Sequence, residues 1–139
     1  MPQALVIGLD SAYNQMVVAA LESFSVRAIN TTTVDVFLDL NCPKRFQLVS
    51  LEIDALHPES SDNIKLLRTH FGEGPATRIV VSSRTIPSTL PMLAEQLGAD
   101  MYMTKPQQPE GMAAVINAEL QKQLDSHEPK LEIKAGRKE

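Results

Sequence analysis

FQLVSL, residues 46–51, is a short and almost continuous apolar run, and two similar runs flank it in the sequence: ALVIGL (residues 4–9) and RIVVSS (residues 78–83). Runs of this length with few polar interruptions are typical of parallel strands that helices cover on both faces. A half-polar strand is also expected near residues 26–31. These segments predict a largely buried parallel sheet.

Between the runs, apolar residues recur at the spacing of amphipathic helices. We expect a helix after an N-cap at Ser11, a weaker one from Val34 to Leu40, and one ending at Gly72. Two more are expected, one closed by Gly98 and one beginning near Pro109. Their apolar stripes are Val17, Ala20, Leu21 and Phe24; Ile64, Leu67 and Phe71; Leu90, Leu93, Ala94 and Leu97; and Met112, Val115, Ile116 and Leu120. Alternating strands and helices predict a doubly wound α/β domain with a five-stranded parallel sheet.

Length and composition predict one globular domain of a reducing compartment. The chain has 139 residues, 43% of them hydrophobic, a net charge of -4 and one cysteine, Cys42, which excludes a disulfide framework. Four of its 13 basic residues lie in the last ten positions, so the body is acidic and a poor match for nucleic acid. No signal peptide or membrane span is evident. We therefore expect a cytoplasmic protein, with a domain over residues 1–124 and a charged tail or linker over residues 125–139.

Polar residues follow the apolar runs, where the carboxyl edge of a doubly wound sheet carries its working site. Carboxylates at this edge are suitable ligands for Mg²⁺, and a hydroxyl and an ammonium group can bind phosphoryl oxygens. The sequence therefore predicts a polar site with features of phosphoryl chemistry. The candidate residues are Asp10, Glu52, Asp54, Ser82, Ser83 and Lys105.

The segment GADMYMTKPQ, residues 98–107, resembles the fifth-strand signature of response-regulator receiver domains, with Gly-Ala, an aromatic residue and Lys-Pro in the same arrangement. IVVSSRT (residues 79–85) resembles their fourth strand, VIGLDS (residues 6–11) their first strand, and LLRTHFG their third helix. The resemblance covers roughly residues 3–124. It implies a flavodoxin-like sheet with strand order 2-1-3-4-5.

The resemblance also implies roles for individual residues. Lys105 matches the lysine that contacts the acceptor carboxylate or its phosphoryl group, and Ser82 matches the hydroxyl residue that binds the phosphoryl group. Tyr102, three residues before Lys105, stands at the position of the switch aromatic, although a simply packed tyrosine is an equal alternative. Asp10 matches the second acid of the usual acidic pair, whereas Leu9 stands in place of the first.

Two carboxylates compete for the phosphoacceptor position. Alignment on the apolar run LVSL places Glu52 there, whereas alignment on the proline that usually follows the acceptor by four residues places Asp54 there, with Pro58. The second alignment would bury Glu52 inside a covered strand, where desolvation of a charge costs several kcal/mol. This cost favours Glu52, and Asp54 remains the alternative.

The departures from the receiver pattern predict a pseudo-receiver, a signalling interaction module with a degenerate acceptor site that acts by protein–protein contact and is not an enzyme. The expected Mg²⁺ binding is weak, through Asp10 and Glu52. The expected partners are a histidine kinase or an output protein, with weak homodimerisation through the face of residues 86–124. The alternative is a functional receiver that a histidine kinase phosphorylates at Asp54.

Overall fold

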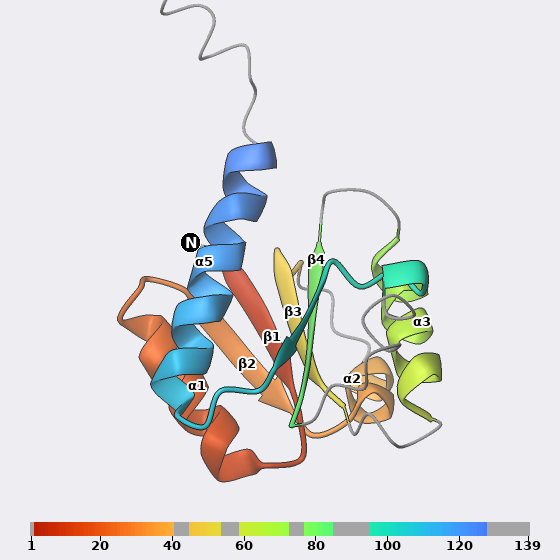
Figure 1. The fold of residues 1–139 in the computed structure, drawn as a ribbon, viewed down its shortest axis with the longest axis horizontal. Helices are drawn as coiled ribbons and strands as arrows, with labels where there is room; N and C mark the ends of the chain where they lie inside the picture. Colours follow the sequence, from red (N-terminus) through yellow and green to blue (C-terminus); the bar gives the residue numbers. More distant parts are fainter. Residues whose placement is uncertain (1, 41–44, 54–58, 73–76, 85–94, 128–139) are drawn as a thin grey trace, which may run out of the picture.

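The structure, a computed structural model, describes residues 2–40, 45–53, 59–72, 77–84 and 95–127. Strands and helices alternate over residues 3–83 of the described segments (Figure 1). The strands are β1 (Gln3–Ile7), β2 (Arg27–Thr31), β3 (Leu48–Glu52), β4 (Arg78–Ser83) and β5 (Met101–Thr104). The helices are α1 (Ser11–Glu22), α2 (Val34–Leu40), α3 (Glu59–Phe71) and α5 (Pro109–His127).

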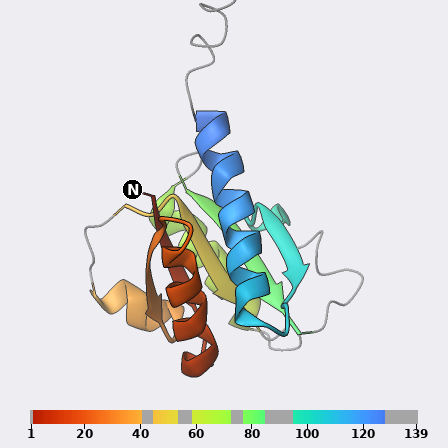
Figure 2. The same cartoon turned by 90° about the vertical axis from the view of Figure 1, so that its left-hand side faces the viewer.

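All five strands are parallel and form one sheet in the order β2-β1-β3-β4-β5, which confirms the predicted doubly wound topology. Helices α1 and α5 cover one face of the sheet and α2 and α3 the other, as the two views together show (Figures 1 and 2). The parallel order brings the carboxyl ends of β1, β3, β4 and β5 to one edge. The candidate functional residues come from this edge.

Strand alternation divides the core into two apolar layers, one on each face of the sheet. Leu5, Ile7, Val49 and Leu51 pack with Phe37, Ile64 and Leu67 beneath α2 and α3. Ala4, Val6 and Leu48 pack with Val17, Leu21, Ile116 and Leu120 beneath α1 and α5. Since Glu52 follows Leu48 by four residues, alternation directs its side chain to the α1–α5 face.

The beginning of α1 differs by one or two residues from the prediction. The first strand ends at Ile7 rather than Leu9, and the N-cap is Asp10 rather than Ser11, which is the first helical residue. The Asp10 carboxylate accepts a hydrogen bond from the Tyr13 amide at 3.1 Å. Both Asp and Ser are good N-caps, so the sequence pattern alone could not choose between two adjacent candidates.

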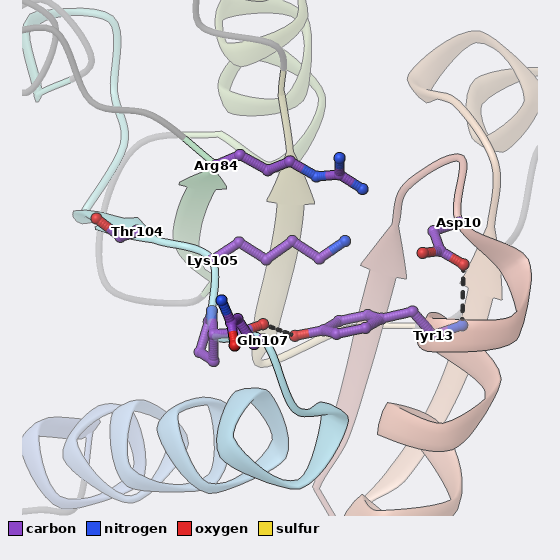
Figure 3. Close-up of a pocket in the computed structure, with 7 residues that line it drawn as sticks. Asp10, Tyr13, Arg84, Thr104, Lys105 and Gln107 are labelled. Atoms are coloured by element: carbon purple, nitrogen blue, oxygen red, sulfur yellow. Dashed lines mark hydrogen bonds between the residues drawn. The ribbon is translucent and has the colours of Figure 1, made fainter.

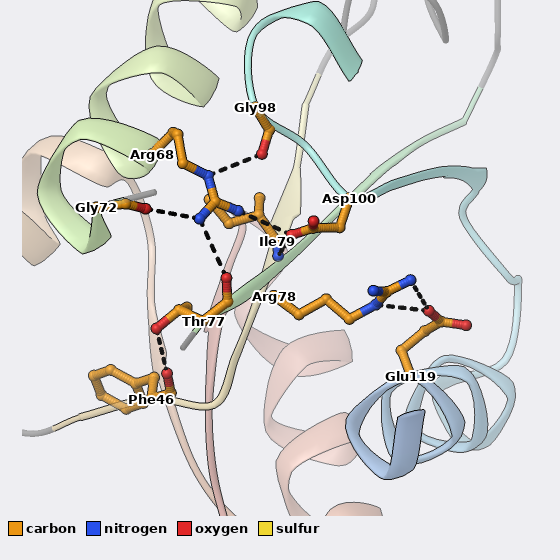
Figure 4. Close-up of polar contacts among 9 residues, drawn as sticks. All are labelled: Phe46, Arg68, Gly72, Thr77, Arg78, Ile79, Gly98, Asp100 and Glu119. Atoms are coloured by element: carbon orange, nitrogen blue, oxygen red, sulfur yellow. Dashed lines mark hydrogen bonds and ion pairs between the residues drawn. The ribbon is translucent and has the colours of Figure 1, made fainter. Parts of the chain in front are cut away.

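Two arginines link elements near the opposite, amino-terminal edge of the sheet (Figure 4). Arg68 of α3 donates to the carbonyls of Gly72, Thr77 and Gly98 and pairs with Asp100 at 2.9 Å. Arg78 of β4 pairs with buried Glu119 of α5 at 2.8 Å. These contacts hold α3, α5 and the strands that precede the candidate site in fixed relative positions.

Several predictions concern residues outside the described segments. Asp54, Pro58 and the stripe residues Leu90, Leu93 and Ala94 lie there, as do residues 128–139 of the predicted tail. Helix α5 continues to His127, three residues beyond the predicted domain boundary at residue 124. Within the described segments, no helix is both long and apolar enough to cross a membrane.

Candidate functional site

An ion pair between Glu52 and Lys105 forms the centre of the carboxyl edge. Glu52 is the last residue of β3 and Lys105 directly follows β5, and Lys105 Nζ donates to Glu52 Oε2 at 3.0 Å. The lysine side chain is 7% exposed and the glutamate side chain 22%. Removing two charges from water to this extent is costly unless they remain paired, so each group is held by the other.

Backbone hydrogen bonds position both members of the pair. The Ile53 amide, just after Glu52, donates to the Ser82 carbonyl at 2.8 Å, and the Lys105 amide donates to the Ser83 carbonyl at 2.7 Å. The β3–β4 and β4–β5 ladders thus continue for one residue beyond the strands. Both side chains therefore project from rigid backbone rather than from free loops.

Tyr13 of α1 forms a third contact to the ion pair. Lys105 Nζ lies 3.9 Å from the centre of the Tyr13 ring, and the Tyr13 hydroxyl donates to the Pro106 carbonyl at 2.5 Å. Burial, together with the negative charges of Glu52, Asp10 and Glu110, raises the pKa of Tyr13 to about 12. The tyrosine therefore stays neutral at physiological pH and fastens α1 to the turn after β5.

Lys105 and Tyr13 line an open cavity of about 470 Å³ (Figure 3). Its wall is formed by Asp10, Tyr13, Arg84, Thr104, Lys105, Pro106 and Gln107. The Lys105 side chain extends between Arg84 and the Tyr13 ring toward α1. Asp10 and Lys105 both line this cavity, and Lys105 also pairs with Glu52.

The first strand presents a different residue to Glu52 than predicted. Leu9, which the sequence pattern placed at the first acidic position, is 77% exposed, and an Asp10 oxygen caps α1. Gly8 lies close to Glu52, since an ideal Cβ atom there would be 2.9 Å from Glu52 Oε1. β1 ends at Ile7, two residues earlier than predicted, so Gly8 directly follows the strand.

The hydroxyl next to Tyr102 in the structure belongs to Ser83 rather than Ser82. Ser83 Oγ and Tyr102 Oη are 3.0 Å apart. Ser82 is in register with Glu52 in the β3–β4 ladder, and its side chain therefore lies on the face of Glu52 and Lys105. Consecutive strand residues point to opposite faces, so the side chains of Ser82 and Ser83 lie on opposite faces of the sheet.

The acidic groups at this edge do not form a ready metal site. Within the described residues, no group of three or more His, Cys, Asp or Glu side chains is placed to hold a metal ion. One Asp10 oxygen caps a helix and one Glu52 oxygen pairs with Lys105. Mg²⁺ favours several oxygen ligands in near-octahedral geometry, and the arrangement of these two carboxylates does not fit that requirement.

Sequence reasoning missed Gly8, Tyr13, Asn14 and Arg84. A glycine directly after an apolar strand was a usable signal, because glycine there often marks a close approach. Tyr13 and Asn14 carried no comparable signal, since helical spacing predicts which face of α1 is buried but not which strand-end residue it meets. Arg84 follows β4 and was overlooked beside the two serines.

No protein-family profile and no curated protein sequence matches this chain. Solved structures do match. A two-component response regulator from Clostridium difficile has a TM-score of 0.75 at 17% identity, covering 93% of this chain and 100% of that one. A CheY-like receiver domain protein from Methanospirillum hungatei has a TM-score of 0.72 at 17% identity, covering 91% and 98%. HP1043, an orphan response regulator of H. pylori, has a TM-score of 0.70 at 20% identity, covering 86% and 96%. The chain therefore has the CheY-like receiver fold of response regulators.

Proposed function

We propose that this chain is a signalling interaction module in which Glu52 occupies the phosphoacceptor position and output does not depend on phosphorylation. The observation that carries the proposal is the ion pair between Glu52 Oε2 and Lys105 Nζ at 3.0 Å. In this pair the carboxylate is already bound to the cation that, by the receiver resemblance, would hold a phosphoryl group. The glutamate thus replaces part of the phosphoryl group permanently.

The length of the glutamate side chain argues against phosphoryl transfer at Glu52. Compared with aspartate, its carboxylate is moved outward by about one C–C bond, or roughly 1.5 Å, and attack on a phosphodonor tolerates little error in position. This displacement disfavours Glu52 as a nucleophile, so we propose no enzymatic activity for this site.

Metal binding is expected to be weak for the same structural reasons. Gly8 has no side chain, Leu9 is exposed, and the carboxylates of Asp10 and Glu52 already accept hydrogen bonds from the Tyr13 amide and Lys105. If Mg²⁺ binds, its ligands would be these two carboxylates, and it would compete with Lys105 for Glu52. This competition lowers affinity without requiring any change of fold.

Output would then pass through protein contacts with signalling proteins of the cytoplasm, either a histidine kinase or an output protein. The face of residues 86–124 remains our candidate for weak homodimerisation. Its described part includes β5 and α5, where Met101 and Met103 are half-buried against the core. Methionine adapts readily to different partners, which suits a transient contact.

The direct test is phosphorylation with a small phosphodonor. The protein is incubated with acetyl phosphate and Mg²⁺ and analysed by intact mass, with a phosphorylatable receiver as positive control. We expect no added phosphoryl group and no thermal stabilisation by beryllofluoride with Mg²⁺. Addition of a phosphoryl group to the unmodified chain that disappears in Asp54→Asn would refute the proposal and favour the alternative, a receiver phosphorylated at Asp54 by a histidine kinase.

A further inference from the structure

Gly8 lies against the acceptor-position glutamate without any side chain of its own. An ideal Cβ atom at position 8 would be 2.9 Å from Glu52 Oε1, 2.8 Å from Asn14 Nδ2 and 3.4 Å from Glu52 Cβ. Contacts shorter than 3.0 Å are essentially absent for real Cβ atoms. Even a methyl group at this position would therefore require Glu52 and Asn14 to move.

The surrounding backbone cannot easily make room. The Gly8 amide donates to the Thr31 carbonyl of β2 at 3.1 Å, and Glu52 is held by its register with Ser82 in β4. Separating the two positions would break the ladder on one side or the other. The steric clash with a side chain at position 8 must therefore be relieved by movement of the ends of the Glu52 and Asn14 side chains.

Movement of those ends has a specific consequence for the ion pair. The carboxylate of Glu52 is planar, so displacing Oε1 also turns Oε2, the oxygen that accepts from Lys105. Asn14 is 3% exposed, which leaves its side chain little space for retreat. Asn14 Nδ2 and Glu52 Oε1 are both buried without a hydrogen-bond partner among the described residues.

We propose that Gly8 is a positioning residue for Glu52, and that the identities of positions 8 and 52 are coupled. The missing side chain at position 8 provides the space that the longer glutamate occupies when it reaches Lys105. A side chain at position 8 is compatible only with a shorter or displaced residue at position 52. The inference rests on the proposed function, since it explains how a glutamate fits at the acceptor position.

The same geometry identifies where an acidic ligand would belong. An acid at position 8 would face position 52, whereas one at position 9 would start from a side chain that is 77% exposed. A combined Gly8→Asp and Glu52→Asp change is therefore expected to create a divalent-cation site. Leu9→Ala with Glu52→Asp is the matched control, since it adds no carboxylate, and is expected to leave cation binding as in Glu52→Asp alone.

A double-mutant cycle with Gly8→Ala and Glu52→Asp tests the coupling. The φ angle of Gly8 is not in the positive range, so alanine suits the backbone and would by itself stabilise the fold slightly through the unfolded state. With Glu52 present, we expect Gly8→Ala to lower the folding equilibrium constant by about tenfold, an effect typical of residues in contact. When Gly8→Ala is introduced into the Glu52→Asp variant, the loss should shrink to about threefold or less, the remainder coming from Asn14.

The Nζ resonance of Lys105 in NMR spectra supplies a readout that stability alone would not change. We expect Gly8→Ala to shift or broaden this resonance, and the control Leu9→Ala to leave it as in the unmodified protein. If Gly8→Ala does not fold, recovery of a folded protein on adding Glu52→Asp supports the proposal, and failure to recover overturns it.

Equal effects of Gly8→Ala in the unmodified protein and in the Glu52→Asp variant, with an unshifted Lys105 resonance, would also overturn the inference. A failure of the proposed function would give a different experimental result from a failure of the coupling. Phosphorylation of the unmodified protein would refute that function while leaving the coupling between positions 8 and 52 measurable.

Discussion

Breaking the Glu52–Lys105 pair with Glu52→Gln is the most informative single perturbation of the site. At the observed 3.0 Å separation, the Coulomb attraction is about 5 kcal/mol for an effective dielectric constant of about 20. Desolvation cancels much of this value. Removing one partner of a buried pair costs about 3–5 kcal/mol, because the other charge remains unpaired. Glu52 is 22% exposed, so water partly compensates, and about 2–3 kcal/mol is a reasonable expectation.

Thermal and urea unfolding would measure this loss. An unfolding entropy of about 2.1 cal/mol/K per residue, applied to 139 residues, converts about 2.5 kcal/mol into a Tm decrease of about 9 °C. Lys105→Met and the double variant complete the cycle, and we expect a coupling energy of about 1–2 kcal/mol. A Glu52→Gln variant within about 0.5 kcal/mol of the unmodified protein, the range of ordinary surface substitutions, would refute the pairing.

Two further predictions follow from the shifted pKa values. The pKa of Tyr13 is raised from 10.0 to about 12, so its contribution to stability is complete below pH 10 and is lost as the pH rises toward 12. Ultraviolet titration should therefore show a phenolic ionisation at high pH. This step should disappear in Tyr13→Phe and remain in Tyr102→Phe. Burial acts to raise the pKa of Glu119, but hydrogen bonds from Lys122 and Arg78 outweigh it and lower the pKa below 4.5. The contribution of Glu119 to the free energy of unfolding is therefore complete above about pH 4.5 and is lost on further acidification. Glu119→Gln should lower that free energy by about 1–2 kcal/mol in urea unfolding at pH 7, and by less at pH 3. An equal cost at both pH values would contradict the assigned cause.

The fold was predictable because its main signals are local and repeated. Each central strand is a short apolar run, and the stripes of the described helices recur with the correct period, so alternation along the chain sufficed to predict a doubly wound sheet. The boundaries were less predictable, since Asp10 and Ser11 are equally good caps and only the end of β1 decides between them. The network around Arg68 was missed because its partners at Gly72, Thr77 and Gly98 are carbonyl groups, which carry no sequence signal.

The candidate site was predicted through a topological rule, and its errors come from the limits of that rule. The rule brings Asp10, Glu52 and Lys105 to one edge, because all three follow parallel strands or end them. It does not specify which face each side chain adopts. Ser83 rather than Ser82 lies beside Tyr102, and in a strand one residue is the difference between the two faces of the sheet.

The Gly8 contact shows why the degenerate site that we propose is harder to derive from sequence than a functional one. A functional receiver is recognised through its acids, and their loss is visible in the sequence, as it was at Leu9. What replaces them is a fit between one long side chain and one absent side chain. The sequence shows the glycine at position 8 but not that Glu52 and Asn14 flank it, and the role of the missing side chain follows only from those two neighbours. If the coupling between positions 8 and 52 is measured as expected, Glu52 is a fitted part of the site rather than a chance replacement. Introducing aspartate at position 52 alone would then leave the site short of an acid at position 8.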